Sequence, residues 1–240
     1  MDFEFSAEQI AIQDAVAKTC AKYGDDYWLE RDTDGVFPED FVKDIAAGGW
    51  LGVAMPEEHG GAGLGVTEAA IVAQTIAQSG ACQSGASAVH INLFGPMPIV
   101  VFGSEEQKSK NLPPLIAGTD RCCFGVTEPD AGLNTTAITT KAERDGDHYV
   151  VHGRKMWTST AQSANKILLL ARTTPKEECK KSTQGLSLFY TDLDRGGATE
   201  VREIAKMGRK AVDSNAVFFD GLRVPKEDLI GEEGKGFHYL

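Results

Sequence analysis

The sequence lacks paired-cysteine motifs and an excess of positive charge, and these absences exclude some classes of protein. Its five cysteines are odd in number, show no CxxC spacing and follow no signal peptide, so we expect neither a disulfide framework nor a redox dithiol. The chain has 24 Lys and Arg against 35 Asp and Glu, a net charge of -11. Binding along nucleic acid needs clustered cations, so a nucleic-acid partner is not expected.

Signals for export or membrane insertion are also lacking. We see no apolar run of bilayer length, and the first residues, "MDFEFSAEQI", lack the Arg-rich, acid-poor character of a transit sequence. The expected location is therefore a reducing, bacterial-type cytoplasm, without membrane insertion.

The first half of the chain has a helical period. From Ser6 to about Thr119, apolar residues recur at three and four positions, and two capping boxes, Ser6 with Gln9 and Ser104 with Gln107, predict helix starts. Further helices are predicted in "PEDFVKDIAAGGW", with Pro38 in the first turn, and in "TEAAIVAQTIAQSG". This half is expected to be all-α.

After about Cys122 the period changes to two. An Asp145-Gly146 turn separates alternating segments and predicts a hairpin, and "KILLLART", "GLSLFYTDL" and "NAVFFDGLRV" predict further strands. The expected fold class is α+β, with an N-terminal helical domain followed by an antiparallel β-sandwich or barrel-like domain. The expected domains are residues 1–120, 121–232 and 233–240, the last being the start of a further helical domain.

Three chemical signals have simpler structural interpretations. "HGGAGLG" lacks both a preceding strand and a GK[ST] ending, so it predicts a turn and not a phosphate loop. His148 and His152 lie on one face of a strand but lack a third ligand, so no metal site is predicted. Cys122 and Cys123 are expected to be buried small hydrophobes, because nothing nearby would lower a thiol pKa.

The stretch "GRKMWTST" places a tryptophan in a predicted strand. Strict alternation would put Lys155, Trp157 and Ser159 on one face, so that an indole and a hydroxyl share a surface. Packing in a core is one interpretation of Trp157. The other is that it covers a planar ligand whose edge is hydrogen-bonded by Ser159.

The turn-rich stretch "FGVTEPDAGLNTT" comes before the first hairpin strand. Pro129 lacks an N–H donor and Gly132 permits a positive φ, so successive backbone N–H groups could converge on an anion. A turn without a ligand is the alternative. An anion nest beside an aromatic platform is what a flavin with a pyrophosphate needs.

Six motifs, in this order and spacing, resemble the N-terminal and middle domains of an acyl-CoA dehydrogenase over essentially the whole chain. They are "MPEEHGGAG", "FGSEEQK", "VTEPDAG", "DGDHYVVHGRKMWTST", "KMG" and "VPKEDLIGEEGKGF". The resemblance implies FAD as cofactor, and it implies a C-terminal helical domain that is missing from this chain.

The resemblance also implies roles for individual residues. The implied flavin-binding residues are Phe124, Val126, Thr127, Gly132, Leu133, Trp157, Thr158 and Ser159. Among them, Thr127 would bond the pyrimidine edge, Gly132 and Leu133 would approach the pyrophosphate, and Ser159 would approach the hydride-accepting nitrogen. Leu133 and Ser182 would lie near the acyl-CoA substrate.

Two positions depart from the family pattern. Leu133 stands where a serine is usual, which leaves only backbone donors for the phosphates. Lys210 stands where an arginine is usual, so an ammonium group replaces a planar guanidinium that could donate two parallel hydrogen bonds. The implied reaction is α,β-dehydrogenation of an acyl-CoA to a trans-2-enoyl-CoA. The catalytic base is expected in the C-terminal domain, and Glu128 is expected to have a structural role, so no catalytic residue is assigned here.

The resemblance implies further properties of the whole protein. It implies fatty-acid β-oxidation, an electron-transferring flavoprotein as electron acceptor, and a homotetramer if the C-terminal domain is present. Two alternatives remain open: a non-catalytic flavin- or CoA-binding partner or remnant, and a flavin monooxygenase or nitroalkane oxidase on the same fold.

Overall fold

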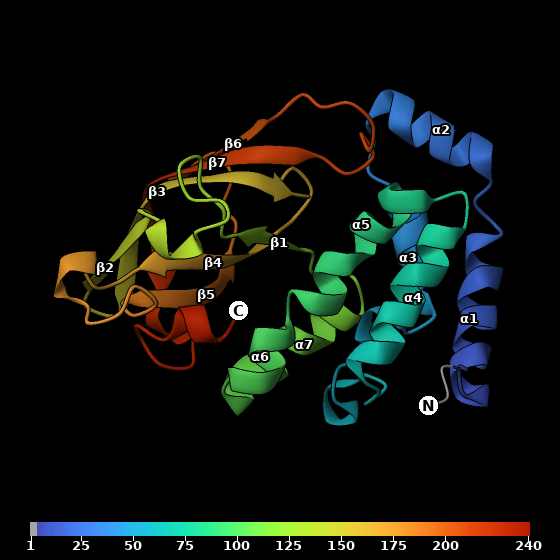
Figure 1. Ribbon diagram of the computed structural model, residues 1–240, viewed down its shortest axis with the longest axis horizontal. Coiled ribbons are helices and arrows are strands. Elements are labelled where there is room, and N and C mark those ends of the chain that lie inside the picture. Colours follow the sequence, from blue (N-terminus) through green and yellow to red (C-terminus); the bar gives the residue numbers. More distant parts are fainter. Residues whose placement is uncertain (1–3) are drawn as a thin grey trace. The chain divides into compact units, whose positions relative to one another are not determined.

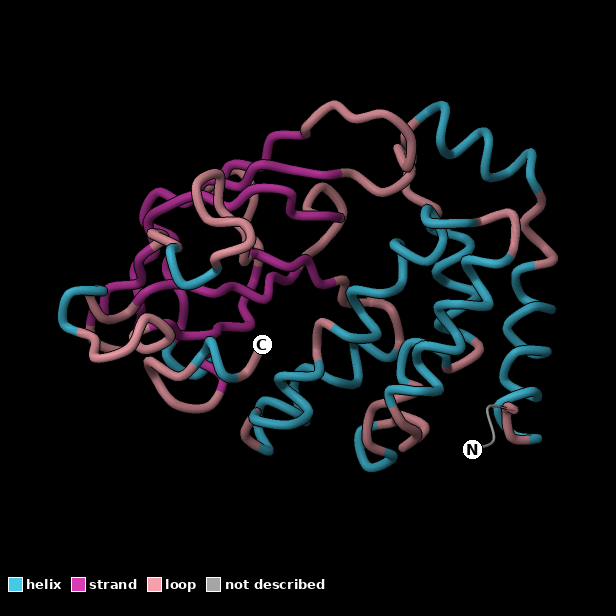
Figure 2. Tube along the Cα trace, viewed as in Figure 1, coloured by secondary structure: helices cyan, strands magenta, loops and turns pink. Residues whose placement is uncertain are grey.

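The computed structural model describes residues 4–240, which form two compact units. The helical unit comprises the residues up to Phe94 together with Leu112–Thr119 and Lys206–Val212. The sheet unit comprises Gly95–Asn111, Asp120–Ala205 and Asp213–Leu240. Figure 2 shows helices dominating the first and strands the second. The prediction of an α+β chain is confirmed, whereas the expected domain limits at 120 and 232 stay predictions.

The helical unit is built from amphipathic helices around one apolar core. Its helices are α1 (Ala7–Cys20), α2 (Asp25–Asp34), α3 (Glu39–Ala47), α4 (Val66–Gln78), α5 (Cys82–Phe94), the last residues of α7 (Glu105–Ile116) and the 3₁₀ turns η1 (Trp50–Gly52) and η2 (Glu57–His59). Ser6 and Gln9 form the predicted capping box. Pro38 is the N-cap of α3, one position before the expected first turn. Phe41 and Ile45 are fully buried in the core.

The glycine-rich stretch after η2 is a structural turn, as predicted. The N–H groups of Gly61, Ala62 and Gly63 donate to the carbonyls of Pro56, Gly52 and Met55. These backbone donors are used within the unit, so they are not available to cradle a phosphate.

The sheet unit contains one mostly antiparallel eight-stranded sheet (Figure 1). Its strands are β1 (Cys122–Gly125), β2 (Lys141–Asp145), β3 (His148–Ser159), β4 (Lys166–Arg172), β5 (Leu186–Asp192), β6 (Thr199–Glu203), β7 (Ser214–Pro225) and β8 (Leu229–Ile230). The order is β6-β7-β3-β2-β4-β5-β8, with β1 beside β4. The predicted hairpin joins β2 to β3 at Asp145↔His148, and Gly146 has φ 62°.

Two pairings differ from the antiparallel expectation, since β1 and β2 both run parallel to β4. Parallel neighbours need a long crossover, and the β2–β3 hairpin supplies it between β1 and β4. The remaining elements of this unit are α6 (Met97–Phe102), the first turns of α7, and the 3₁₀ turns η3 (Thr135–Ala137), η4 (Lys176–Glu178), η5 (Lys226–Asp228) and η6 (Gly236–His238).

The expectation that the chain has no apolar run of bilayer length is corrected by the stretch Cys82–Phe102. Cys82–Phe102 is long and apolar enough to cross a membrane by length and composition, so the statement that no run reaches this length is wrong. In the structure 56% of an 18-residue window of this stretch is buried, and a turn at Gly95-Pro96 divides the stretch into α5 and α6. The core helix of a globular protein meets the same length and composition criterion.

Candidate functional site

The "TEP" segment follows β1 directly and closes into a tight turn. Glu128 N–H donates to Ala131 O at 3.2 Å, and Ala131 N–H donates to Glu128 O at 3.1 Å. Gly132, beyond the turn, does not have the positive φ that its glycine permits, and a Cβ there would meet no atom within 4 Å. The anion nest in this turn therefore stays a prediction, and it does not depend on a left-handed Gly132.

A buried ion pair joins this turn to β3. Lys155 Nζ donates to Glu128 Oε1 at 2.8 Å and to Val126 O at 3.1 Å, and its side chain is fully buried. Glu128 also accepts hydrogen bonds from Thr139 N, Thr139 Oγ1 and Thr140 N, at 2.7, 2.9 and 2.9 Å. The carboxylate thus has four donors, as a buried charge requires. The predicted structural role of Glu128 agrees with these contacts.

The charges of the pair follow from its surroundings. Burial raises the pKa of Glu128, but the ammonium of Lys155 and the hydrogen bonds from Lys155, Thr140 and Thr139 outweigh it and hold the pKa at about 2. Burial lowers the pKa of Lys155 to about 8, against the opposing effect of Glu128. Both side chains are therefore predominantly charged at neutral pH.

We expect this pair to make the sheet unit sensitive to acid. The folded pKa of Glu128 lies below its ordinary value of 4.5, so its stabilising contribution is present above pH 4.5 and is lost as the pH falls towards 2. Urea unfolding from neutral pH to pH 2 should show this loss. The Lys155→Met/Glu128→Leu double variant should lack it, and an equal loss in both proteins would contradict the assignment.

The strand that carries Trp157 is interrupted by a β-bulge. Between β3 and β7 the register shifts from Lys155↔Val217 to Thr158↔Asn215, so Met156 and Trp157 together oppose Ala216. Met156 N–H instead donates to Thr127 O at 2.8 Å. Thr127 and the Trp157 strand, distant in sequence, are therefore adjacent.

The bulge overturns the expected alternation. Lys155 is fully buried whereas Trp157 is 60% exposed, so the two do not share a face. Trp157 has φ 62°, a left-handed conformation that costs a bulky residue about 1–3 kcal/mol. One extra residue shifts the side chains beyond it to the other face of the strand. Strain of this kind is a reason to look for function at Trp157.

Buried polar groups hold the strand beyond Trp157. Asn215 is fully buried, and its Nδ2 donates to Thr158 O at 2.9 Å. Its Oδ1 accepts from Gln162 Nε2 at 3.0 Å. Thr158 is buried, and its hydroxyl has no hydrogen-bond partner among residues 4–240, whereas Ser159 is half-buried.

The other predicted site residues differ in accessibility. Phe124 and Thr127 are half-buried, Val126 is buried, and Gly132 and Leu133 are exposed. Their main chain lies on β1 or in the stretch that follows it. Ser182 is exposed in the loop between η4 and β5, and in the described part of the chain no hydrogen bond joins it to the turn or to β3. The structure therefore brings Thr127 to the Trp157 strand but shows no such link for Ser182.

Sequence reasoning missed Lys155 and Asn215 as supports of this region. For Lys155 the sequence did contain a signal: a lysine within a predicted strand, with a glutamate in a nearby turn, indicates a buried ion pair. The interpretation of Cys122 and Cys123 as buried residues is confirmed: both are fully buried, and burial raises the pKa of both thiols, that of Cys122 to about 12.

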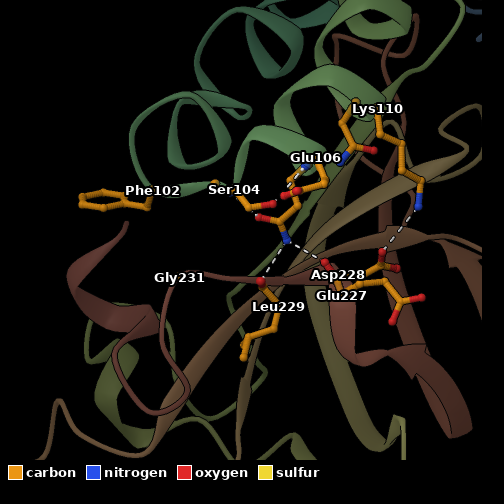
Figure 3. Close-up of a pocket in the computed structure, with 11 residues that line it drawn as sticks. Phe102, Ser104, Glu106, Lys110, Glu227, Asp228, Leu229 and Gly231 are labelled. Atoms are coloured by element: carbon orange, nitrogen blue, oxygen red, sulfur yellow. Dashed lines mark hydrogen bonds and ion pairs between the residues drawn. The ribbon is translucent and has the colours of Figure 1, made fainter.

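A separate cavity of about 620 Å³ lies in the sheet unit, between the first turn of α7 and the η5–β8 segment (Figure 3). Gln107 Nε2 donates to Glu227 O and Leu229 O at 2.7 and 2.9 Å, and Ser104 caps the helix reciprocally with Gln107. Lys110 Nζ lies 3.8 Å from Asp228 Oδ1. No residue predicted to bind flavin lines this cavity, which is therefore distinct from the candidate site.

Comparison with known proteins places this arrangement in a family. Residues 6–119 match the acyl-CoA dehydrogenase N-terminal domain, and residues 123–222 match the acyl-CoA dehydrogenase middle domain. The two matches cover most of the chain in the order of the helical and sheet segments. The chain therefore belongs to the acyl-CoA dehydrogenase family.

Individual relatives agree with this assignment. The chain is 32% identical to a 3-(aryl)acrylate reductase of Clostridium sporogenes over 87% of its own length and 54% of the relative. It is also 32% identical to the Bacillus subtilis protein named probable acyl-CoA dehydrogenase YngJ, over 99% and 61% of the two chains. The structure of butyryl-CoA dehydrogenase from Megasphaera elsdenii matches with a TM-score of 0.89 and 27% identity, covering 100% and 62%. The chain thus spans little more than half the length of these relatives.

Proposed function

We propose that this chain supplies one wall of an FAD site for α,β-dehydrogenation of an acyl-CoA thioester to a trans-2-enoyl-CoA. The observation that carries the proposal is the Met156–Thr127 hydrogen bond, which joins the "TEP" turn to the strand of an exposed, strained Trp157. Family membership supplies the reaction class.

The residues present fit a planar, anionic cofactor. Trp157 offers a largely exposed ring for the flavin plane, and Thr127 and Ser159 are accessible enough to hydrogen-bond its edge. The backbone N–H groups of Gly132 and Leu133 make no hydrogen bond within residues 4–240 and can donate to the pyrophosphate. Phe124 can be reached in part, whereas Val126 and Thr158 are buried and can contribute only main-chain atoms or packing.

Bound flavin would accept the β-hydrogen of the substrate as hydride. Among this chain's residues, Trp157 would lie against one face of the ring and exclude water there, and Ser159 and Thr127 would position the edge of the ring. Glu128 does not serve as the base, because it is buried, bonded by four donors and paired with Lys155. We propose that the base belongs to a C-terminal helical domain, as in the family.

Acyl-CoA contact is proposed at Leu133 and Ser182, both of which are exposed. On the same family grounds we propose β-oxidation in the cytoplasm, a homotetramer, and an electron-transferring flavoprotein as electron acceptor.

Reduction of an acrylate is a second candidate reaction, favoured by the similarity to the 3-(aryl)acrylate reductase. It acts on the same pair of carbon atoms in the opposite direction. Anaerobic mixing of flavin-loaded protein that includes the base-carrying C-terminal domain with acyl-CoA or with an aryl acrylate would separate the two, because acyl-CoA would bleach oxidised flavin whereas an aryl acrylate would restore the colour of reduced flavin.

Trp157→Leu should weaken FAD binding roughly tenfold and raise the fluorescence of the flavin that remains bound, because the aromatic stack is lost. Titration with FAD, followed by visible absorbance and emission, measures both effects. Phe5→Leu, which changes an exposed aromatic residue of the other unit, is the matched control. Failure of the unmodified chain to bind FAD would contradict the proposal, and oxygen consumption without acyl-CoA oxidation would favour the monooxygenase or oxidase alternative.

A further inference from the structure

Lys155 binds the main chain of the turn as well as the carboxylate of Glu128. Lys155 Nζ holds Val126 O and Glu128 Oε1, and the next residue, Met156, holds Thr127 O. Three successive residues of the turn are therefore bound by two successive residues of β3. Trp157 follows immediately, and its side chain is 60% exposed.

The pair also fixes the turn from its other side. Glu128 binds both Thr139 and Thr140, and Thr140 Oγ1 donates to Arg154 O at 3.3 Å. Arg154 precedes Lys155, so these contacts close a loop from β3 through the turn and back to β3. A closed network of this kind restricts the turn to one position on the strand.

A buried ion pair is not needed for stability alone. Apolar residues of similar volume often serve equally well, because they avoid the desolvation of two charges. What an ion pair adds is a requirement for defined geometry, since its donors and acceptors are directional. In this chain the ion pair lies beside the β-bulge, where the backbone of Trp157 has a left-handed conformation that has to be held in place.

We propose that the buried Lys155–Glu128 pair is a positioning element, which fixes Trp157 and Thr127 relative to each other and so presets the wall that receives the planar cofactor. The positioning itself concerns only residues of this chain. Its consequence for the cofactor depends on the proposed function.

The test uses the full 240-residue chain labelled with fluorotryptophan and observed by fluorine NMR without FAD. The chain has three tryptophans, and Trp157→Phe identifies the signal of Trp157. Trp28 and Trp50 belong to the helical unit and report whether that unit is unchanged. Two variants are compared: Glu128→Gln, which keeps the shape, and Lys155→Met/Glu128→Leu, which replaces the pair by apolar residues.

The double variant should stay folded, with native circular dichroism and protected β3 and β7 amides. The Trp157 signal should nevertheless shift or broaden in both variants, while the Trp28 and Trp50 signals stay in place. The control is Lys141→Met/Glu143→Leu, which removes an exposed pair of the same hairpin, at 2.9 Å, and should leave all three signals unchanged.

A folded double variant with an unmoved Trp157 signal would overturn the inference. A second readout, FAD affinity, should fall at least tenfold in the double variant. If Trp157 moves but the unmodified chain binds no FAD, the positioning role stands and the proposed function fails. If Trp157 moves and FAD binds equally well to both proteins, the link between the pair and the cofactor is refuted.

Discussion

Lys155→Met alone should lower the free energy of unfolding of the sheet unit by about 3–5 kcal/mol, the usual cost of removing one partner of a buried ion pair. The variant would leave Glu128 only 4% exposed, with hydrogen bonds from Thr139 and Thr140 but no countercharge. Methionine fills most of the space of the lysine stem, so the loss reports the charge and not a cavity.

Hydrogen exchange of β3 and β7 amides as a function of urea would measure this loss in the sheet unit itself. The matched control is Lys141→Met, whose pair with Glu143 is 52% and 64% exposed and should contribute little to stability, because solvent screens it. Adding Glu128→Leu to Lys155→Met should restore most of the stability. A cost below about 1 kcal/mol for Lys155→Met would contradict the burial of this pair.

Gly61→Ala should destabilise the helical unit by about 3 kcal/mol, at the upper end for overpacking. An added Cβ would lie 2.1 Å from Met55 O, 2.5 Å from Met55 C and 2.8 Å from Gly52 O. These are backbone atoms, so no side chain can rotate out of the way. The whole turn would have to move, at the expense of the hydrogen bonds from Gly61 N–H to Pro56 O and from Ala62 N–H to Gly52 O.

Gly24→Ala is the control for this substitution. Gly24, the N-cap of α2, has φ -76°, and a Cβ there meets nothing within 4 Å, so the change should cost about 1 kcal/mol or less, the effect of alanine as a poorer N-cap residue. Thermal unfolding followed by the fluorescence of Trp28 and Trp50 would compare the two variants. Equal midpoints would show that the turn after η2 adapts freely, contrary to the expectation.

Much of the fold was predictable because local chemistry determines it. The capping boxes at Ser6 and Ser104 each use a residue three positions away, and both form as expected. The Asp145-Gly146 turn joins the hairpin because glycine accepts the positive φ of that turn. Parallel pairing of β1 with β4 was missed, because pairing partners far apart in sequence leave no periodic signal.

The candidate site was predictable in its members but not in its arrangement. Motif order alone indicated that Trp157 and the "TEP" turn belong together, and the Met156–Thr127 bond shows them adjacent. The assumed alternation of side chains between the two faces of β3 failed at the β-bulge, where β3 has one extra residue. Lys155 is buried there and Trp157 is exposed. Glycine at position 132 permits a positive φ, but the folded chain does not use it there.

The sequence by itself determined the change from helical to strand period, the helix starts, the hairpin turn and the family, because each depends on residues close together or on motifs in fixed order. Only the tertiary structure decided that Lys155 meets Glu128 across 27 positions and that β3 bulges at Met156 and Trp157. Both follow from satisfying buried charges and backbone groups with partners that the folded sheet alone brings within reach.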